Sequence, residues 1–203
     1  MTDGATLAAG IVAVVGGYLL GTVPTAHLAA RRHGVDPTRI GTRNPGATNV
    51  LQNVGRTAGI VTLVGDLAKG LVAAGVGWAV DGRTLAVACG AAAVLGHVAP
   101  VTRSFRGGKG VATGVGMALA TFPVAAAVGI ALFAGTWAAL RRSSVLQEAG
   151  IVAMPVVAAL TGADGWELAG VGAVAALIVV RLHAGRAVPA PPGPVAPAVA
   201  TEG

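Results

Sequence analysis

Long apolar stretches dominate this chain of 203 residues and constrain its fold more than any other feature. They lie at about 5–30, 57–80, 84–101, 111–140, 144–161 and 166–182. A helix that crosses a bilayer needs about 20 apolar residues, and most of these stretches reach that length. Lipid offers the backbone no hydrogen-bond partner, so such segments must be helical. The sequence therefore predicts an all-α integral membrane protein, with one polytopic domain over residues 1–187.

The composition does not fit an ordinary soluble domain. Charged residues make up 11% of the chain and the mean hydropathy is +0.76, whereas soluble domains carry about 25% charged residues. The net charge of +6 is compatible with nucleic acid, but aromatic residues make up only 3% of the chain, so no base-stacking surface is expected. We therefore expect a lipid bilayer, and no nucleic acid, as the partner. The Pro- and Ala-rich residues 188–203 are predicted to form a disordered tail.

Basic residues gather in the segments that separate alternate apolar stretches. Twelve of the 14 Lys and Arg residues lie there: Arg31, Arg32, Arg39, Arg43, Arg56, Arg103, Arg106, Lys109, Arg141, Arg142, Arg181 and Arg186. The opposite ends of the stretches carry Asp3, Asp81, Asp164 and Glu167. By the positive-inside rule, the basic segments are cytoplasmic. No Lys or Arg precedes the first stretch, as it would in a signal peptide, so the N-terminus is expected outside.

The stretch 111–140 lies between two basic segments, so it must enter the membrane and return on the same side. It therefore predicts two short helices that turn at Phe122-Pro123, as either two short spans or a re-entrant pair. The resulting topology has seven helices, an outside N-terminus and a cytoplasmic C-terminus. We expect a multi-pass protein of the cell membrane, with its functional site facing the cytoplasm.

The first cytoplasmic segment contains a polar run that is rich in turn-forming residues. Gly41 and Gly46 allow positive φ, and successive N–H groups in such a turn can hold an anion. Arg39 and Arg43 add positive charge. Hydrogen-bonding side chains follow at Asn44, Thr48 and Asn49. The run predicts an anion site, and the alternative is a solvated loop whose arginines only set the topology.

A second glycine-rich segment, Gly107-Gly108-Lys109-Gly110, precedes the stretch that begins at residue 111. A helix N-terminus attracts anions, and a lysine adds a point charge. The segment lacks the spacing of a nucleotide-binding P-loop. A ligand that carries phosphate is the natural expectation, and the alternative is a basic hairpin that only sets the topology.

Three further polar residues lie inside apolar stretches. Asp66 and Lys69 are three residues apart on one helix face, so they can neutralise each other, either as a structural pair or facing a ligand. His97 lies near a cytoplasmic helix end, as either a helix-contact residue or a catalytic one. Soluble-type acyltransferases carry an Asp five positions after a His, and no histidine of this chain has one.

These segments together resemble the bacterial acyl-phosphate–glycerol-3-phosphate acyltransferases, small seven-helix enzymes of the inner membrane. The matching strings are GTVP at 21–24, GTRNPGATNVL at 41–51, DLAKG at 66–70, LGH at 95–97 and FRGGKGVAT at 105–113. Their order and spacing agree with the family over about residues 10–115. The part after about residue 120 matches mainly in hydropathy.

The resemblance implies that an acyl group passes from acyl phosphate to the 1-hydroxyl of glycerol 3-phosphate, giving lysophosphatidic acid without a metal or other cofactor. The implied catalytic residues are Thr42, Asn44, Lys109 and His183. The implied substrate-binding residues are Arg43, Gly46, Thr48, Asn49, Asp66, Lys69, His97, Gly107, Gly108 and Gly110. The sequence assigns no oligomeric state.

The chain departs from the family pattern at several positions. Thr42 stands where a serine is usual, and Gln52 where an arginine is usual. Near the C-terminus only His183 matches, because the following Glu and Asn are absent. Arg43 is expected to replace part of the charge that Gln52 lacks. The alternatives to an enzyme are a weakened or inactive relative that binds lipid or a lipid-synthesis partner, and a small transporter, for which Asp66 and Lys69 are the clear mid-membrane charges.

Overall fold

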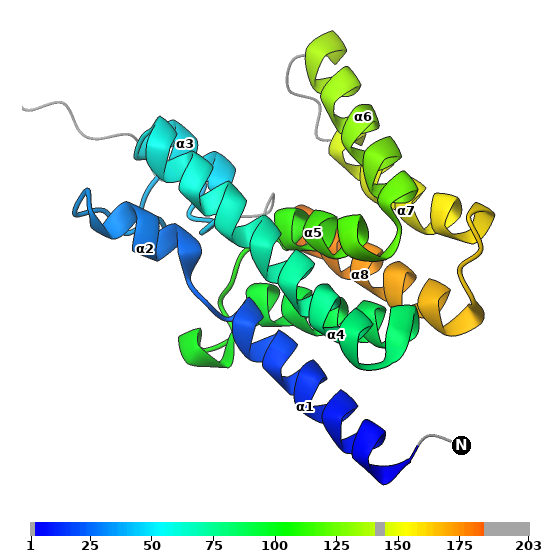
Figure 1. Cartoon of the computed structure of the whole chain (residues 1–203). Helices are drawn as coiled ribbons and strands as arrows, with labels where there is room; N and C mark the ends of the chain where they lie inside the picture. The colour runs from blue at the N-terminus through cyan, green and yellow to red at the C-terminus, as the bar shows by residue number, and fades with distance from the viewer. Residues whose placement is uncertain (1–2, 141–144, 185–203) are drawn as a thin grey trace, which may run out of the picture.

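The computed structural model describes residues 3–140 and 145–184, and every regular element within these ranges is a helix. The elements in chain order are α1 (Gly4–Gly21), α2 (Thr25–Arg31), α3 (Ala47–Asn53), α4 (Arg56–Val98), the 3₁₀ turn η1 (Val101–Arg103), α5 (Val111–Thr121), α6 (Pro123–Leu140), α7 (Val145–Leu160) and α8 (Gly165–Ala184). Figure 1 shows them as a bundle with α2 and α3 at one end and the N-terminus at the other. The predicted all-α class is confirmed.

The first apolar stretch is broken into two helices at Pro24. α1 ends at Gly21, and the Thr22 N–H donates to the Tyr18 and Leu19 carbonyls. Proline has no N–H to continue this ladder, and it disfavours the helical conformation in the residue before it. α2 therefore starts afresh at Thr25. The break exposes backbone and the Thr25 side chain to the interior of the bundle, where the candidate site lies.

The helix α4 consists of two antiparallel halves joined at Asp81 and Gly82. Both residues have non-helical backbone angles, and Gly82 has a φ of 73° that favours glycine. Beyond this turn the halves pack closely, since a Cβ on Gly77 would lie 2.5 Å from the Ala86 Cα. The two predicted stretches 57–80 and 84–101 are thus confirmed as separate helices.

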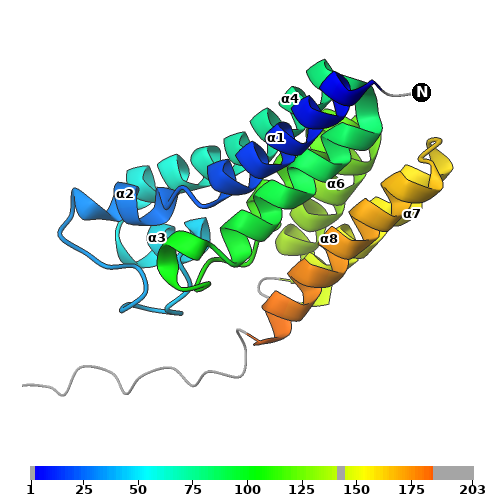
Figure 2. The same cartoon turned by 90° about the horizontal axis from the view of Figure 1, so that it is seen from below.

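Small residues allow α1 to pack against the second half of α4. Figure 2 shows the two helices side by side. A Cβ on Gly17 would lie 2.7 Å from the Cys89 carbonyl oxygen, and one on Gly21 would lie 2.1 Å from that of Ala93. Neither position has room for a side chain. Close backbone approach of this kind is typical of helices packed in membranes.

Arg83 lies at the end of the bundle opposite α2 and α3. It is not one of the twelve basic residues assigned to the cytoplasmic segments, nor does it lie within the membrane as Lys69 does. Arg83 Nε donates to Glu167 Oε1 at 2.9 Å, and Arg83 Nη2 donates to the Gly162 carbonyl at 2.7 Å. The guanidinium also lies 4.9 Å from the centroid of the Phe122 ring. Arg83 thus joins the turn of α4 to the connection between α7 and α8, and its charge is matched there.

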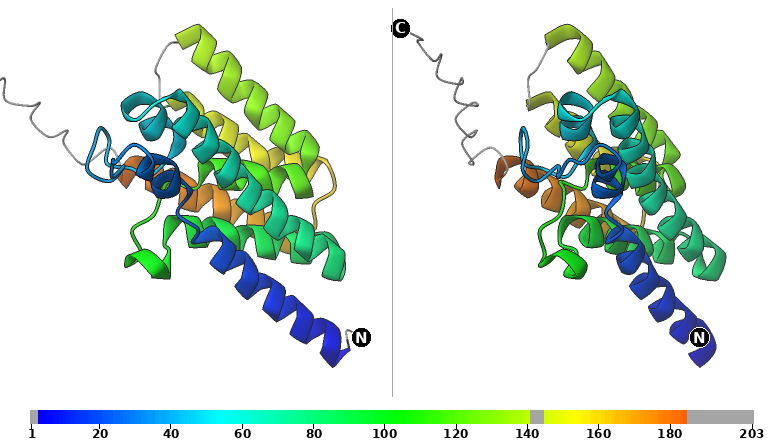
Figure 3. Two further views of the ribbon diagram at one scale, coloured as in Figure 1. Left: turned by 60° about the vertical axis from the view of Figure 1, so that its left-hand side comes forward. Right: turned by 90° about the vertical axis from the view of Figure 1, so that its left-hand side faces the viewer.

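The predicted turn at Phe122-Pro123 is confirmed, because α5 ends at Thr121 and α6 begins at Pro123. α6 then packs along α7, as Figure 3 shows. Their contact is also close, with a Cβ on Gly150 only 2.7 Å from the Gly129 carbonyl oxygen. α8 completes the bundle by packing against α4 and α7.

Within residues 3–140 and 145–184, three helical stretches are long and apolar enough to cross a membrane: Gly4–Arg31, Arg56–Arg103 and Gly165–Ala184. The second of them contains both halves of α4. α5 has 11 residues, which rise about 16 Å and fall short of a hydrocarbon core of about 30 Å. The count of seven spans stays a prediction. The predicted tail 188–203 and the basic pair Arg141-Arg142 lie outside the described residues.

Candidate functional site

A buried ionic cluster joins α2 to both halves of α4. Lys69 Nζ lies 2.8 Å from Asp66 Oδ1, and both side chains are almost fully buried. The Thr25 hydroxyl donates to the same carboxylate oxygen at 2.5 Å. His97 Nδ1 lies 3.4 Å from that oxygen. The predicted neutralisation of Asp66 by Lys69 is confirmed, and the structure adds a hydroxyl and an imidazole that the sequence did not place there.

The imidazole of His97 is fixed from two sides. Asp66 faces its Nδ1 atom, and Gly108 lies against its other nitrogen, where a Cβ would be 2.2 Å from Nε2. Only a residue without a side chain fits between this ring and the chain. The glycine at 108 is therefore explained by the close approach to His97, with no need for an unusual φ.

The N–H groups of Gly107 and Gly108 donate within the chain, so substrate binding at these two glycines, which the family resemblance implies, stays a prediction. The Gly107 N–H donates to the Val98 carbonyl, and the Gly108 N–H donates to the His97 carbonyl, both at 3.1 Å. A helix leaves its last four carbonyls without intrahelical partners, and this segment supplies donors for two of them at the end of α4. Gly110 is the N-cap of α5 with a φ of 85°.

The polar run after α2 is organised around the Asn49 side chain. Its Nδ2 donates to the carbonyls of Pro37 and Ile40, and its Oδ1 accepts from the Thr42 N–H at 3.0 Å and from Asn53 Nδ2 at 3.1 Å. The side chain is buried and its hydrogen-bonding capacity is used. Asn49 thus holds the loop together, and substrate binding by its side chain stays a prediction.

Two other details of this run differ from expectation. Gly46 has an extended φ of −131° and is the N-cap of the short helix α3, within a segment predicted to be a loop. Positive φ occurs at Gly41 (50°), as predicted, and at Arg43 (56°) in place of Gly46. Thr42, Arg43 and Thr48 are exposed, and Asn44 is half-buried, so this part of the loop presents its polar side chains outward.

A pocket lies between the α1–α2 break, both halves of α4 and the segment that follows α4. Its walls are formed by Gly21, Thr22, Val23, Pro24, Thr25, Ala26, His27, Pro45, Lys69, His97, Pro100, Arg103, Gly107 and Gly108. This lining contains a lysine, an arginine and two histidines but no Asp or Glu. Positive charge in a partly buried pocket favours an anion. The pocket brings together four of the predicted residues, Lys69, His97, Gly107 and Gly108.

The other predicted residues do not line this pocket. Lys109 is half-buried just beyond Gly108. His183 lies in the last turn of α8 with 56% of its side chain exposed, and its Nε2 is 3.8 Å from Glu148 Oε1. Arg181, two residues earlier, donates from Nη2 to the Gly107 carbonyl at 3.2 Å. His183 is therefore at the same end of the molecule as the glycine segment, but not in the pocket.

An apolar groove lies beyond the other end of the glycine segment. It is lined by Val111, Gly114, Val115, Met117, Ala118, Ile151, Met154, Val171, Val174, Ala175 and Ile178 from α5, α7 and α8. The segment Gly107–Val111 thus starts in the wall of a cationic pocket and ends in the wall of an apolar groove. A small molecule that fits both the cationic pocket and the apolar groove has an anionic head on a hydrocarbon chain.

Comparison with known proteins agrees with this division. The family model described as glycerol-3-phosphate acyltransferase matches residues 11–187. The chain belongs to this family.

Curated members and solved structures cover most of the chain. The glycerol-3-phosphate acyltransferase of Thioalkalivibrio sulfidiphilus is 45% identical over 177 residues, with 84% of this chain and 85% of the relative covered. That of Geotalea daltonii is 38% identical over 172 residues, with 84% and 89% covered. The crystal structure of PlsY (YgiH), an integral membrane glycerol 3-phosphate acyltransferase in its glycerol 3-phosphate form, has a TM-score of 0.82 at 29% identity. It covers 86% of this chain and 88% of PlsY.

Membership of this acyltransferase family confirms the resemblance found in the sequence strings. It does not explain three pocket residues that were not expected there, Thr25, His27 and Arg103. Thr25 directly follows Pro24 and a helix break, a signal that could have placed it in the interior. His27 and Arg103 carry no local signal for their meeting, because they lie 76 positions apart.

The contact between Gly108 and His97 predicts a specific steric effect. Gly108→Ala should displace the imidazole from Asp66 and lower the free energy of unfolding by about 1–3 kcal/mol, because an added methyl group in a packed site forces neighbours to move. Thermal unfolding of the purified protein in detergent measures this change. Gly75→Ala is the matched control, since a Cβ at position 75 in α4 meets nothing within 4 Å. Equal melting temperatures for the two variants would contradict the prediction.

Proposed function

We propose that this chain transfers a fatty acyl group from acyl phosphate to the 1-hydroxyl of sn-glycerol 3-phosphate, giving lysophosphatidic acid and inorganic phosphate. The observation that carries the proposal is the segment Gly107–Val111, which borders both the cationic pocket and the apolar groove. Phosphate groups suit the pocket, and the acyl chain suits the groove. A solved relative in its lysophosphatidic acid form, with a TM-score of 0.79 and 30% identity, gives further support.

The proposed reaction is a direct acyl transfer and needs no covalent intermediate with the protein. The hydroxyl oxygen attacks the acyl carbon, the bond from that carbon to the phosphate oxygen breaks, and phosphate leaves. Acyl phosphate is an activated donor, so positioning and neutralisation of negative charge supply much of the rate. Lys109 lies between the glycines that line the pocket and the start of α5. At this position its charge can bind the phosphate of the acyl phosphate, while the acyl chain lies in the groove along α5. Both substrates then meet at the glycine segment.

The remaining site residues are proposed to have four roles. Thr42, Asn44 and His183 are, together with Lys109, the proposed catalytic side chains, and Arg43 and Thr48 are the proposed substrate contacts on the outward face of the loop. Lys69 and His97 are proposed to face substrate from the pocket wall. The other predicted residues are proposed to hold these side chains in place: Asp66, Asn49, Gly46, Gly107, Gly108 and Gly110.

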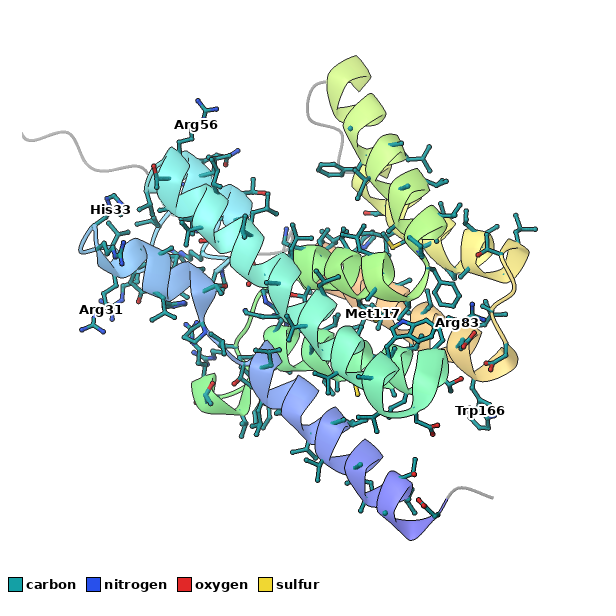
Figure 4. All side chains as sticks on the ribbon, viewed as in Figure 1. Arg31, His33, Arg56, Arg83, Met117 and Trp166 are labelled. Atoms are coloured by element: carbon teal, nitrogen blue, oxygen red, sulfur yellow. The ribbon has the colours of Figure 1, made fainter. Side chains whose placement is uncertain are left out.

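The proposed site faces the cytoplasm of a multi-pass protein of the cell membrane, with the N-terminus outside. The distribution of charge supports this orientation. In Figure 4, Arg31, His33 and Arg56 lie at one end of the bundle, and Arg83 and Trp166 lie at the other. The polar loop belongs to the first of these ends, where the positive-inside rule expects the cytoplasm.

The direct test is an assay of the purified protein with acyl phosphate and labelled glycerol 3-phosphate. We expect labelled lysophosphatidic acid to form, and Lys109→Met to reduce its rate of formation by about 10- to 100-fold while the melting temperature stays unchanged, because a charged hydrogen bond to phosphate is lost. Wild-type protein that forms no product above a blank without enzyme would instead identify the chain as an inactive relative.

A further inference from the structure

Arg103 is aimed into the pocket by an unusual turn. It ends the 3₁₀ turn η1, and the next two residues, Ser104 and Phe105, both have positive φ (49° and 61°). Non-glycine residues seldom adopt this conformation, so the surrounding structure must stabilise it. The turn sends the Arg103 side chain into the pocket wall, whereas Arg106 on the same segment is exposed.

The side-chain partner of Arg103 in the pocket is an imidazole. Nη1 lies 2.6 Å from His27 Nδ1, and Nη2 contacts His27 Nε2. A guanidinium has five N–H donors and no acceptor, whereas a neutral imidazole offers one acceptor and a protonated one offers none. His27 therefore cannot accept hydrogen bonds from all the N–H groups of Arg103. The planar guanidinium can donate two parallel hydrogen bonds, a geometry that matches the oxygens of a phosphate.

Neither of the nearby carboxylates lines the pocket. Asp36 lies 3.5 Å from His27 Nε2. Its Oδ1 also accepts from the Thr38 hydroxyl at 2.7 Å and from the Thr38 N–H at 2.9 Å, and these bonds lower the pKa of Asp36. Asp66 is in contact with Lys69, Thr25 and His97. The pocket lining beside Arg103 therefore contains hydrogen-bond donors but no carboxylate.

We propose that Arg103 and His27 bind a phosphate group in this pocket, as one side of the site at which the proposed acyl transfer takes place. The phosphate belongs to glycerol 3-phosphate, to acyl phosphate, or to the inorganic phosphate that the reaction releases. The guanidinium binds two of its oxygens, and His27 donates to a third or holds the guanidinium in plane. Lys69 and His97 lie in the wall of the same pocket, where Asp66 matches the charge of Lys69.

The experiment compares Arg103→Met with Arg106→Met, which removes an exposed arginine three positions further along. The quantities measured are KM for each substrate, kcat, and the inhibition constant for inorganic phosphate. We expect Arg103→Met to raise one of the three binding constants by about 10- to 100-fold, and Arg103→Lys to restore part of the loss. The constant that rises identifies the source of the phosphate. Arg106→Met should leave all three within about twofold.

A second measurement makes the proposal independent of turnover. Inorganic phosphate should raise the melting temperature of the wild-type protein and of Arg106→Met, but not that of Arg103→Met or His27→Leu. If Arg103→Met does not fold, Arg103→Lys carries both measurements and should show weaker phosphate binding than wild type. Equal phosphate binding by Arg103 and Arg106 variants in both measurements overturns the proposal. A wild-type protein that binds phosphate through Arg103 but forms no product would defeat the proposed acyl transfer alone.

Discussion

Asp66→Ala should lower the free energy of unfolding by about 3–5 kcal/mol. The substitution leaves the Lys69 ammonium buried without its carboxylate, with only 4% of its side chain exposed. It also removes the acceptor for the Thr25 hydroxyl and the atom that faces His97 Nδ1. A buried charge that has lost its partner is far more costly than a buried pair is beneficial. Equilibrium unfolding in mixed detergent micelles measures the change.

The matched control removes both charges. Asp66→Ala combined with Lys69→Met should recover most of the stability lost in the single variant, because no unpaired charge stays buried. Thr25→Ala should cost about 1 kcal/mol, the typical value for a single hydrogen bond. If the double variant is less stable than Asp66→Ala alone, the pair does more than neutralise charge. The interpretation of Asp66 as a scaffold for Lys69 and His97 would then be wrong.

Loss of charge at Arg43 should have the largest effect on catalysis among the loop residues. Arg43 is exposed on the polar loop, and Gln52 in α3 lacks the charge that the family usually places there. A charged hydrogen bond to phosphate is worth about 1.5–3 kcal/mol, which corresponds to about 10- to 150-fold in kcat/KM. We therefore expect Arg43→Ala to nearly abolish a low wild-type activity, and Gln52→Arg to increase it.

The backbone at Arg43 determines which substitutions are informative. Its φ of 56° is disfavoured for alanine, whereas asparagine tolerates this region. Arg43→Asn removes the charge with less backbone strain, so it should reduce kcat/KM as much as Arg43→Ala without lowering the melting temperature. Arg32→Asn, at another exposed arginine of the same end, is the control and should change neither quantity. A Gln52→Arg variant with unchanged kcat/KM would show that Arg43 does not compensate for Gln52.

Local patterns in the sequence were enough to predict most of the helices, but they did not predict the break at Pro24 or the short helix α3. Apolar stretches had to become helices because lipid leaves backbone groups no other partners, and their boundaries agree with α7 and α8. Phe122-Pro123 predicted the turn between α5 and α6, since proline ends the preceding helix. The Asp66–Lys69 pair was predictable as well, because residues three apart share one helix face. Family strings then indicated the reaction.

The sequence determined its helices, the end of the bundle that is basic, and the family of the chain, because each of these depends on neighbours along the chain. Only the tertiary structure decided which polar groups are hydrogen-bonded within the chain and which face a pocket. The Gly107 and Gly108 amides are taken by the open end of α4, and Asn49 is taken by its own loop. His27 and Arg103 meet only because α2 packs beside the segment after α4. Contacts of this kind depend on how helices pack, and a periodic pattern along one helix does not encode which helix lies beside it.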